Sequence, residues 1–246
     1  MTGLVGKLFG RKTVDDPEPA GLARLDYDST PEMWAATTSE FAAPLQGDDA
    51  DVAVLRPLLA RTQLERRPLR LCYDSDVQGF DAALFHRGVD AFGASIVLCE
   101  TTDGDRAGGY NPRGWVGLGE DRDAIAAFLF ALPRGGGEAV KLPKTGGASL
   151  AVVEDRPDRG PAFGPEGLRC LLDANDGMGG RRATSRLGSY YERMPGGCKS
   201  LFQPPASGRA SRGGGVVAEM ARLRAWVAEG DGEEWVLDGI VWKTKC

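Results

Sequence analysis

The chain has 246 residues, of which 42% are hydrophobic and 26% are charged. This balance is ordinary for a globular protein that buries one substantial core. The formal net charge of -5 at pH 7 argues against a general nucleic-acid binder and against electrostatic adhesion to anionic lipid. No apolar run in the sequence is long enough to form a transmembrane helix.

The cysteines indicate the compartment. They are scattered, odd in number and never spaced as C-x-x-C, and no secretory apolar segment is present; they are Cys72, Cys99, Cys170, Cys198 and Cys246. Small secreted domains, in contrast, carry cysteines that pair into disulfides. We therefore expect free thiols in a reducing intracellular compartment, most simply the cytoplasm, with the organelle left open.

The start of the chain predicts a flexible tail followed by a helical arm. Residues 1–28 run through the stretch DDPEP, which breaks regular structure. Residues 29–68 are predicted to form the arm, with a first helix that begins at Pro31 behind a serine–threonine cap. A second helix is predicted over 49–66, where apolar residues recur at helical spacing. Pro57 is expected to kink this helix or to mark its true start.

From residue 69 onward the apolar pattern changes to that of strands with one further helix. Alternation predicts a strand over 69–73, helical spacing predicts a helix over 79–92, and β-branched residues predict a strand over 94–100. Asp103-Gly104 follows and is a strong signal for a hairpin turn. An antiparallel pair of strands is therefore expected around this turn.

The remainder of the chain predicts more strands, over 125–132, 149–153, 168–173 and 234–242. The stretch 222–230 fits a helix or a strand, and its flanking glycines favour the strand. A loop insertion rich in Gly, Ser and Pro is expected at about 203–215. Many short strands and few helices indicate an α+β, mainly β domain over 69–246, arranged as a two-sheet antiparallel β-sandwich with flanking helices.

A G-x-G pattern at Gly117 and Gly119 raises the question of a phosphate-binding loop. Such a loop must follow a strand and open a helix, so that backbone N–H groups face the phosphates. Here Glu120 and Asp121 come next, and their carboxylates would repel a phosphate. The sequence instead predicts that these glycines form the corner of a sheet.

Candidates for covalent chemistry are sparse in this sequence. The single histidine, His86, lies within the predicted 79–92 helix, where a packed or surface histidine is expected. Nucleophilic catalysis would need an accessible imidazole, and no G-x-S-x-G elbow is present. One histidine without C-x-x-C pairs offers no zinc ligand set. We therefore predict a protein that is not an enzyme, with no catalytic residue, cofactor or metal.

Several short motifs follow one another between residues 69 and 132. They are Tyr73-Asp74-Ser75, Gly79-Phe80, Phe85-His86 with Asp90, Thr102-Asp103-Gly104, Gly108-Gly109-Tyr110 and Ala127-Phe128-Leu129-Phe130. In their order and spacing, these motifs resemble the TLDc domain family. The segments 160–176, 186–192 and 236–242 resemble the later motifs of the family. The chain looks most similar to the plant and green-algal branch.

The resemblance implies a two-sheet antiparallel sandwich without an established catalytic site. Members of the family include oxidation-resistance proteins that protect cells under oxidative stress, and several bind the vacuolar proton pump, the V-ATPase. A non-enzymatic protein-interaction module is therefore expected, with V-ATPase subunits or another large complex as its partner. Two alternatives stay open: a structural subunit of a large assembly, attached through 1–68 and 203–215, and a thiol-based redox protein.

Two sets of residues are candidate sites. Glycine-rich turns at 108–119 and 160–167 would let a partner backbone approach closely, and aromatic side chains beside them would act as exposed anchors. The candidate partner-binding residues are Gly108, Gly109, Tyr110, Trp115, Phe163 and Gly164. Cys198 is the candidate redox thiol, because Lys199 follows it and a neighbouring cation favours the thiolate.

Overall fold

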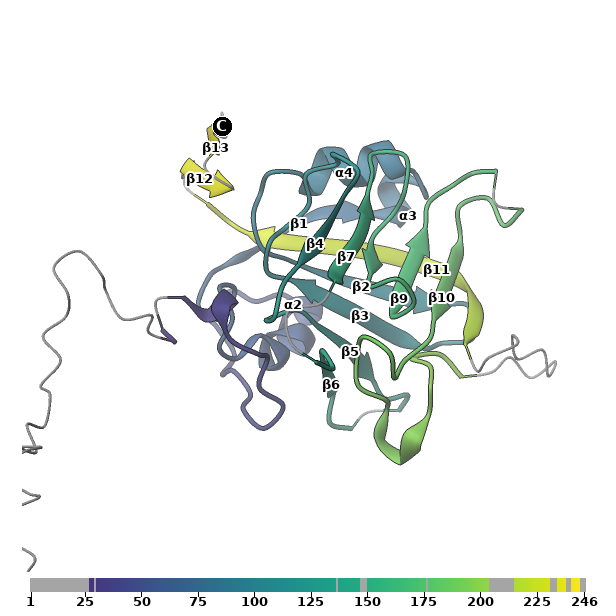
Figure 1. Ribbon diagram of the computed structural model, residues 1–246, viewed down its shortest axis with the longest axis horizontal. Coiled ribbons are helices and arrows are strands. Elements are labelled where there is room, and N and C mark those ends of the chain that lie inside the picture. The colour runs from purple at the N-terminus through teal and green to yellow at the C-terminus, as the bar shows by residue number, and fades with distance from the viewer. Residues whose placement is uncertain are drawn as a thin grey trace, which may run out of the picture.

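A computed structural model describes residues 27–28, 30–135, 137–146, 150–175, 177–203 and 215–230, together with two short strands over 234–237 and 240–243. Figure 1 shows that strands dominate the molecule and that its few helices are short. No helix in these ranges combines the length and the apolar composition that a membrane-spanning segment requires. The strands are β1 Leu69–Asp74, β2 Ser95–Thr101, β3 Arg106–Asn111, β4 Glu120–Asp123, β5 Phe128–Leu132, β6 Val140–Pro143, β7 Leu150–Asp155, β8 Ala162–Phe163, β9 Leu168–Leu171, β10 Arg182–Ser185, β11 Val216–Ala228, β12 Glu234–Leu237 and β13 Ile240–Lys243.

Strands β1 to β11 form one antiparallel sheet, in which β11 connects two halves. The order is β4-β7-β8-β9-β10-β11-β2-β3-β5-β6, and β1 also pairs with β11. The start of β11 pairs with β10, and its later part pairs with β2 and β1, with a shift in register between Met220 and Arg222. Figure 1 shows this strand of 13 residues crossing the whole domain. The predicted mainly β, antiparallel fold is confirmed, whereas the pairing gives one continuous sheet and not two separate ones.

The two halves of the sheet share one hydrophobic core. Buried residues of β2, β3 and β5 cluster with buried residues of β7, β8, β9 and β10. Gly109 of β3 illustrates how closely the halves approach, because a Cβ atom there would lie only 2.7 Å from the Phe163 ring of β8. The sheet therefore folds over on itself and buries an inner face between its halves.

A second hydrophobic core lies on the outer face of β2, β3, β5 and β11. Ile96 and Leu98 belong to it, whereas Val97 and Cys99 belong to the inner core, as the alternation of side chains along a strand requires. Residues 52–64 cover this outer face, and their buried members are Val52, Leu55, Leu58, Leu59 and Leu64. Residues 52–64 are thus packed on the domain.

The segment that was predicted as a helical arm contains little helix. The second predicted helix is reduced to α2 Ala50–Leu55 and the 3-10 turn η2 Arg56–Leu59. Pro57 stands within the first two positions of η2, where its missing N–H group is tolerated. The α-helix begins earlier, at Ala50, and ends before the proline. The first predicted helix is only the 3-10 turn η1 Pro31–Met33. Packing of the apolar side chains on the sheet, and not helix propensity, determines this segment.

Two short helices lie near the predicted helix over 79–92. They are α3 Ser75–Gln78 and α4 Ala82–Val89, and Gly79 separates them with a φ of +76°, which glycine adopts without a Cβ penalty. The Asp81 side chain caps α4 by accepting a hydrogen bond of 2.8 Å from the Leu84 N–H. The helix is confirmed over 82–89, and it buries Phe85 and His86.

Most of the predicted strands are confirmed, with changed bounds. The Asp103-Gly104 turn joins β2 and β3, and Gly104 has a φ of +85°. The ambiguous stretch 222–230 falls mostly within β11. The single strand predicted over 234–242 is instead the hairpin of β12 and β13. Residues 1–26 of the tail predicted over 1–28, and most of the loop predicted at 203–215, lie outside the described residues.

Candidate functional site

The glycine-rich corner around Gly117 binds a carboxylate of the protein itself. Gly117 and Gly119 have φ values of +63° and +77°, and the chain continues into β4 and not into a helix, so the predicted sheet corner is confirmed. The N–H groups of Val116 and Gly117 donate to the two carboxylate oxygens of Asp155, at 2.9 and 3.2 Å. Successive backbone N–H groups form an anion-binding concavity, and the Asp155 side chain lies where a ligand anion would lie.

His86 lies next to this carboxylate, and both of its ring nitrogens are engaged. The Nδ1 atom is 2.8 Å from Asp90 Oδ1, and the Nε2 atom is 2.9 Å from the carbonyl oxygen of Arg159. Burial lowers the pKa of His86, but Asp90, the Arg159 carbonyl and Asp155 together outweigh it and raise the pKa above its ordinary value. With acceptors at both nitrogens, the doubly protonated ring fits this site. The sequence left a packed and a surface position open, and the structure gives the packed one, since His86 is 4% exposed.

Together His86, Asp90 and Asp155 form what we call the His86 cluster. Their ligand-type atoms all lie within 4.8 Å of one another, a grouping that the sequence did not reveal because Asp155 comes from a distant strand. Imidazole and carboxylate are donors that zinc accepts. In this cluster, however, Asp155 accepts backbone N–H groups on both oxygens, and His86 Nδ1 is bonded to Asp90. The arrangement ties α4, the glycine corner and the end of β7 together.

The pKa of the buried Asp155 carboxyl group is subject to opposing influences. Burial raises its pKa, the N–H groups of Val116 and Gly117 oppose this change, and the negative charge of Asp90 adds to it. Its 2% exposure leaves those two N–H groups and the nearby imidazole as its stabilising partners. The carboxylate is therefore a structural anion.

The aromatic residues that were predicted as partner anchors lie in the core. Tyr110 and Phe163 are fully buried, and Trp115 is 1% exposed. The Trp115 Nε1–H donates to Ser95 Oγ at 2.8 Å, which satisfies its polar atom inside the protein. The prediction that Tyr110 or Trp115 is an exposed anchor is wrong. Tyr110 lies in β3, which has β2 and β5 on either side, and Trp115 packs edge-to-face against Phe85 and Phe163.

The glycines of the same prediction accommodate the core of this chain. A Cβ atom at Gly108 would collide with the Val97 carbonyl oxygen. Gly164 has a φ of +66°, and a Cβ atom there would lie 3.2 Å from the Tyr191 ring. Close approach is the reason for glycine at these positions, as expected, but the approaching groups belong to the protein itself.

Among the described cysteines, Cys198 is the exposed one. Its Sγ atom lies 3.6 Å from the carbonyl oxygen of Ser200. Cys99 and Cys170 are buried, and burial raises the pKa of Cys72 to about 12, which makes these three thiols poor nucleophiles. Cys246 lies outside the described residues.

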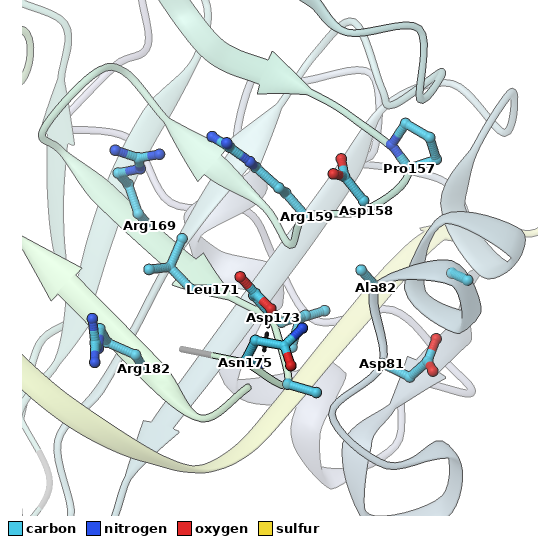
Figure 2. A pocket seen from close by; sticks show the side chains of 13 residues that line it. Asp81, Ala82, Pro157, Asp158, Arg159, Arg169, Leu171, Asp173, Asn175 and Arg182 are labelled. Atoms are coloured by element: carbon cyan, nitrogen blue, oxygen red, sulfur yellow. Dashed lines mark hydrogen bonds between the residues drawn. The ribbon is translucent and has the colours of Figure 1, made fainter. Parts of the chain in front are cut away.

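A groove of about 840 Å³ lies on the outer surface of β9 and β10 (Figure 2); we call it the β9–β10 groove. Strand alternation buries Leu168 and Cys170 and turns Arg169 and Leu171 outward into this groove. The start of α4 and the turns at 157–159 and 173–175 line its sides. The groove thus draws on segments that are distant in the sequence.

Charged side chains line the β9–β10 groove in a segregated pattern. Figure 2 shows Arg169 and Arg182 over the strands, with the Arg159 side chain directed toward Arg169, whereas Asp81 and Asp158 lie toward α4. The His86 cluster helps to hold this rim, because the carbonyl oxygen of Arg159 accepts the hydrogen bond from His86 Nε2. Alternation along β9 and β10 predicts that Arg169 and Arg182 face outward. It does not predict that these strands lie beside the turn at 157–159 and the start of α4.

Fold and site together define a mainly β, antiparallel domain with a cluster of buried ionisable groups and a charged surface groove. A profile of the TLDc domain matches residues 48–199. Because this match spans more than half of the sequence, the chain belongs to the TLDc domain family. The match begins within the segment that was predicted as an arm, which agrees with the burial of residues 52–64 against the sheet. A comparison with curated proteins gave no match.

Proposed function

We propose that this protein is a non-enzymatic protein-interaction module that contributes to protection against oxidative stress. The family match over 48–199 carries the proposal, because the TLDc domain is associated generally with oxidation-resistance proteins and is generally non-catalytic. A protective function without catalysis requires that the domain act through a partner.

The state of the ionisable groups supports a binding function. The imidazole of His86 is the only one in the sequence, and both of its nitrogens are hydrogen-bonded within the protein. General base or nucleophilic catalysis would require one of these nitrogens to reach a substrate. The β9–β10 groove, in contrast, presents charged side chains on an accessible surface.

We propose V-ATPase subunits as the partner, on the strength of the family resemblance. The test uses the full chain as immobilised bait and purified V-ATPase sectors as prey, under reducing and under oxidising conditions. We expect saturable capture of at least one sector. Capture of none under either condition, by bait whose fold is verified by circular dichroism, would refute this partner.

A second candidate function is that of a thiol-based redox protein, which the exposed thiol of Cys198 favours. Thiol-specific alkylation over a range of pH, compared between the wild type and Cys198→Ser, tests it. A reactive thiolate at neutral pH that disappears in Cys198→Ser would favour this function. Reactivity like that of a free cysteine would remove it.

The third function, a structural subunit of a large assembly, concerns the segments at 1–68 and 203–215. Limited proteolysis of the isolated protein and of its assembled form distinguishes it from the first proposal. Protection of both segments in the assembly, together with loss of the assembly when they are removed, would support this function. Transient binding with both segments still cleavable favours the interaction module.

A further inference from the structure

Two arginines of the β9–β10 groove, Arg159 and Arg169, share one counterion among the residues that the structure describes. Arg159 forms an ion pair with Glu154, and Arg169 Nη2 lies 3.5 Å from the same carboxylate. One carboxylate thus serves two guanidinium groups. The Nε atom of Arg169 is shielded from solvent and has no hydrogen-bond partner among the described residues. Unsatisfied charged donors of this kind favour the binding of an anion.

Burial makes this shortage significant. The side chains of Arg169 and Arg159 are 30% and 38% exposed, so water screens them only in part. Burial first, and then the positive charge of Arg159, lower the pKa of Arg169. An additional negative charge between them would relieve both the desolvation and the repulsion of like charges.

The aspartates of the groove are not the missing counterions. Asp81 caps α4, Asp158 forms a two-fold hydrogen bond with Arg156, and Asp173 accepts the Asn175 N–H. All three residues are exposed, so their charges are hydrated. They also limit the ligand, because a dianionic phosphate would be repelled by this side of the groove more strongly than a single carboxylate.

We propose that the β9–β10 groove is a binding site for an acidic side chain, glutamate or aspartate, on a segment of a protein partner. The inference rests on the proposed function and specifies the chemistry of the partner. Arg169 and Arg159 bind the carboxylate, and the neighbouring Leu171, which also lines the groove, provides an apolar contact for the stem of the acidic side chain.

Glu154 acts as an internal competitor for this site. It has a φ of +51°, a left-handed conformation that is unfavourable for a side-chain-bearing residue, and its carboxylate is 44% exposed. The residue holds the arginines in the absence of a partner and is displaced when the partner's carboxylate arrives. Removal of its charge should therefore strengthen binding.

The test is an NMR titration of the labelled full chain, with arginine Nε–H and backbone amide signals as the readout. The probes are a short Gly/Ser peptide with capped ends and one central glutamate, the same peptide with glutamine, and inorganic phosphate. We expect the glutamate peptide alone to shift the Arg169 signal and the backbone amides of Asp158 and Arg159 saturably. Arg169→Gln should weaken binding about 10-fold, and Glu154→Gln should strengthen it about 2- to 5-fold.

Arg186→Gln is the matched control, because Arg186 is an exposed arginine that pairs with Glu166 and does not line the groove. Its affinity for the peptide should equal that of the wild type. Equal shifts with the glutamine peptide, stronger binding of phosphate, or weaker binding by Glu154→Gln would each overturn the proposal. Glu154→Gln keeps the test valid even if Arg169→Gln does not fold.

The failure of this inference differs from a failure of the proposed function. If a V-ATPase sector is captured equally by the wild type and by Arg169→Gln, the protein is an interaction module but the groove is not its acidic-residue site. If the titration succeeds and no V-ATPase sector is captured, the groove stands and the proposed partner falls.

Discussion

The His86 cluster and the β9–β10 groove both concentrate charge, but they differ in where the partners of those charges lie. In the cluster, the Asp155 carboxylate has two backbone N–H donors, and His86 has an acceptor on each nitrogen. In the groove, Arg159 and Arg169 share the single carboxylate of Glu154. A buried charge with a full set of partners serves the fold, whereas a half-buried charge without one is available to a ligand.

The strongest test of this comparison is Asp155→Ala. The change leaves two N–H groups without an acceptor and removes a negative charge beside His86, so we expect the free energy of unfolding to fall by about 3 kcal/mol. Urea denaturation measures it. Asp158→Ala, which changes an exposed carboxylate of the groove, should leave stability almost unchanged. A small effect of Asp155→Ala would mean that the cluster does not stabilise the fold.

The glycine corner gives a second test with a matched control. Gly117→Ala should destabilise the protein by about 2 kcal/mol, because it combines a positive φ with a Cβ atom 2.6 Å from Asp90 Oδ2. Gly135→Ala carries only the positive φ, with no atom within 4 Å of the new Cβ, and should cost about 1 kcal/mol. Equal losses in thermal or urea unfolding would show that Asp90 moves away freely and is not held by His86.

A third, smaller effect concerns the pH dependence of stability. The pKa of His86 is raised in the folded protein. The contribution of the protonated His86 to stability is therefore complete below the pKa of the unfolded chain, about 6.5, and is lost as the pH rises through the pKa of the folded protein. The stability difference between the wild type and His86→Gln should therefore shrink from acidic to alkaline pH. Urea denaturation across this range checks it, and a difference that grows with pH would contradict the assignment.

The smallest expected effect is that of Arg169→Gln on stability. Because this arginine is only partly compensated, its neutral replacement should change the free energy of unfolding by less than about 0.5 kcal/mol. A loss comparable to that of Asp155→Ala would place Arg169 among the structural charges and remove the contrast between the two regions. Thermal unfolding of both variants in one buffer is sufficient.

Local sequence patterns predicted the elements whose causes are local. Alternation indicated β1, the Asp103-Gly104 pair indicated the turn between β2 and β3, and the charges after Gly119 indicated a corner instead of a phosphate loop. The aromatic residue Trp115 was misjudged, because its burial depends on Phe85 and Phe163, which reach it from other parts of the chain. The arginines of the β9–β10 groove were also missed, because different segments of the chain bring them together.

The sequence by itself determined that this protein is mainly β and that its motifs are those of a TLDc domain, since periodicity, composition and motif order are properties of the chain. Only the tertiary structure decided that β11 joins the two halves of the sheet, that Asp155 reaches His86, and that Arg159 meets Arg169. The residues that meet at Asp155 and His86, and the strands that β11 joins, are far apart in the sequence. Their energies arise from burial and from charges at close range, which exist only once the sheet has folded over on itself.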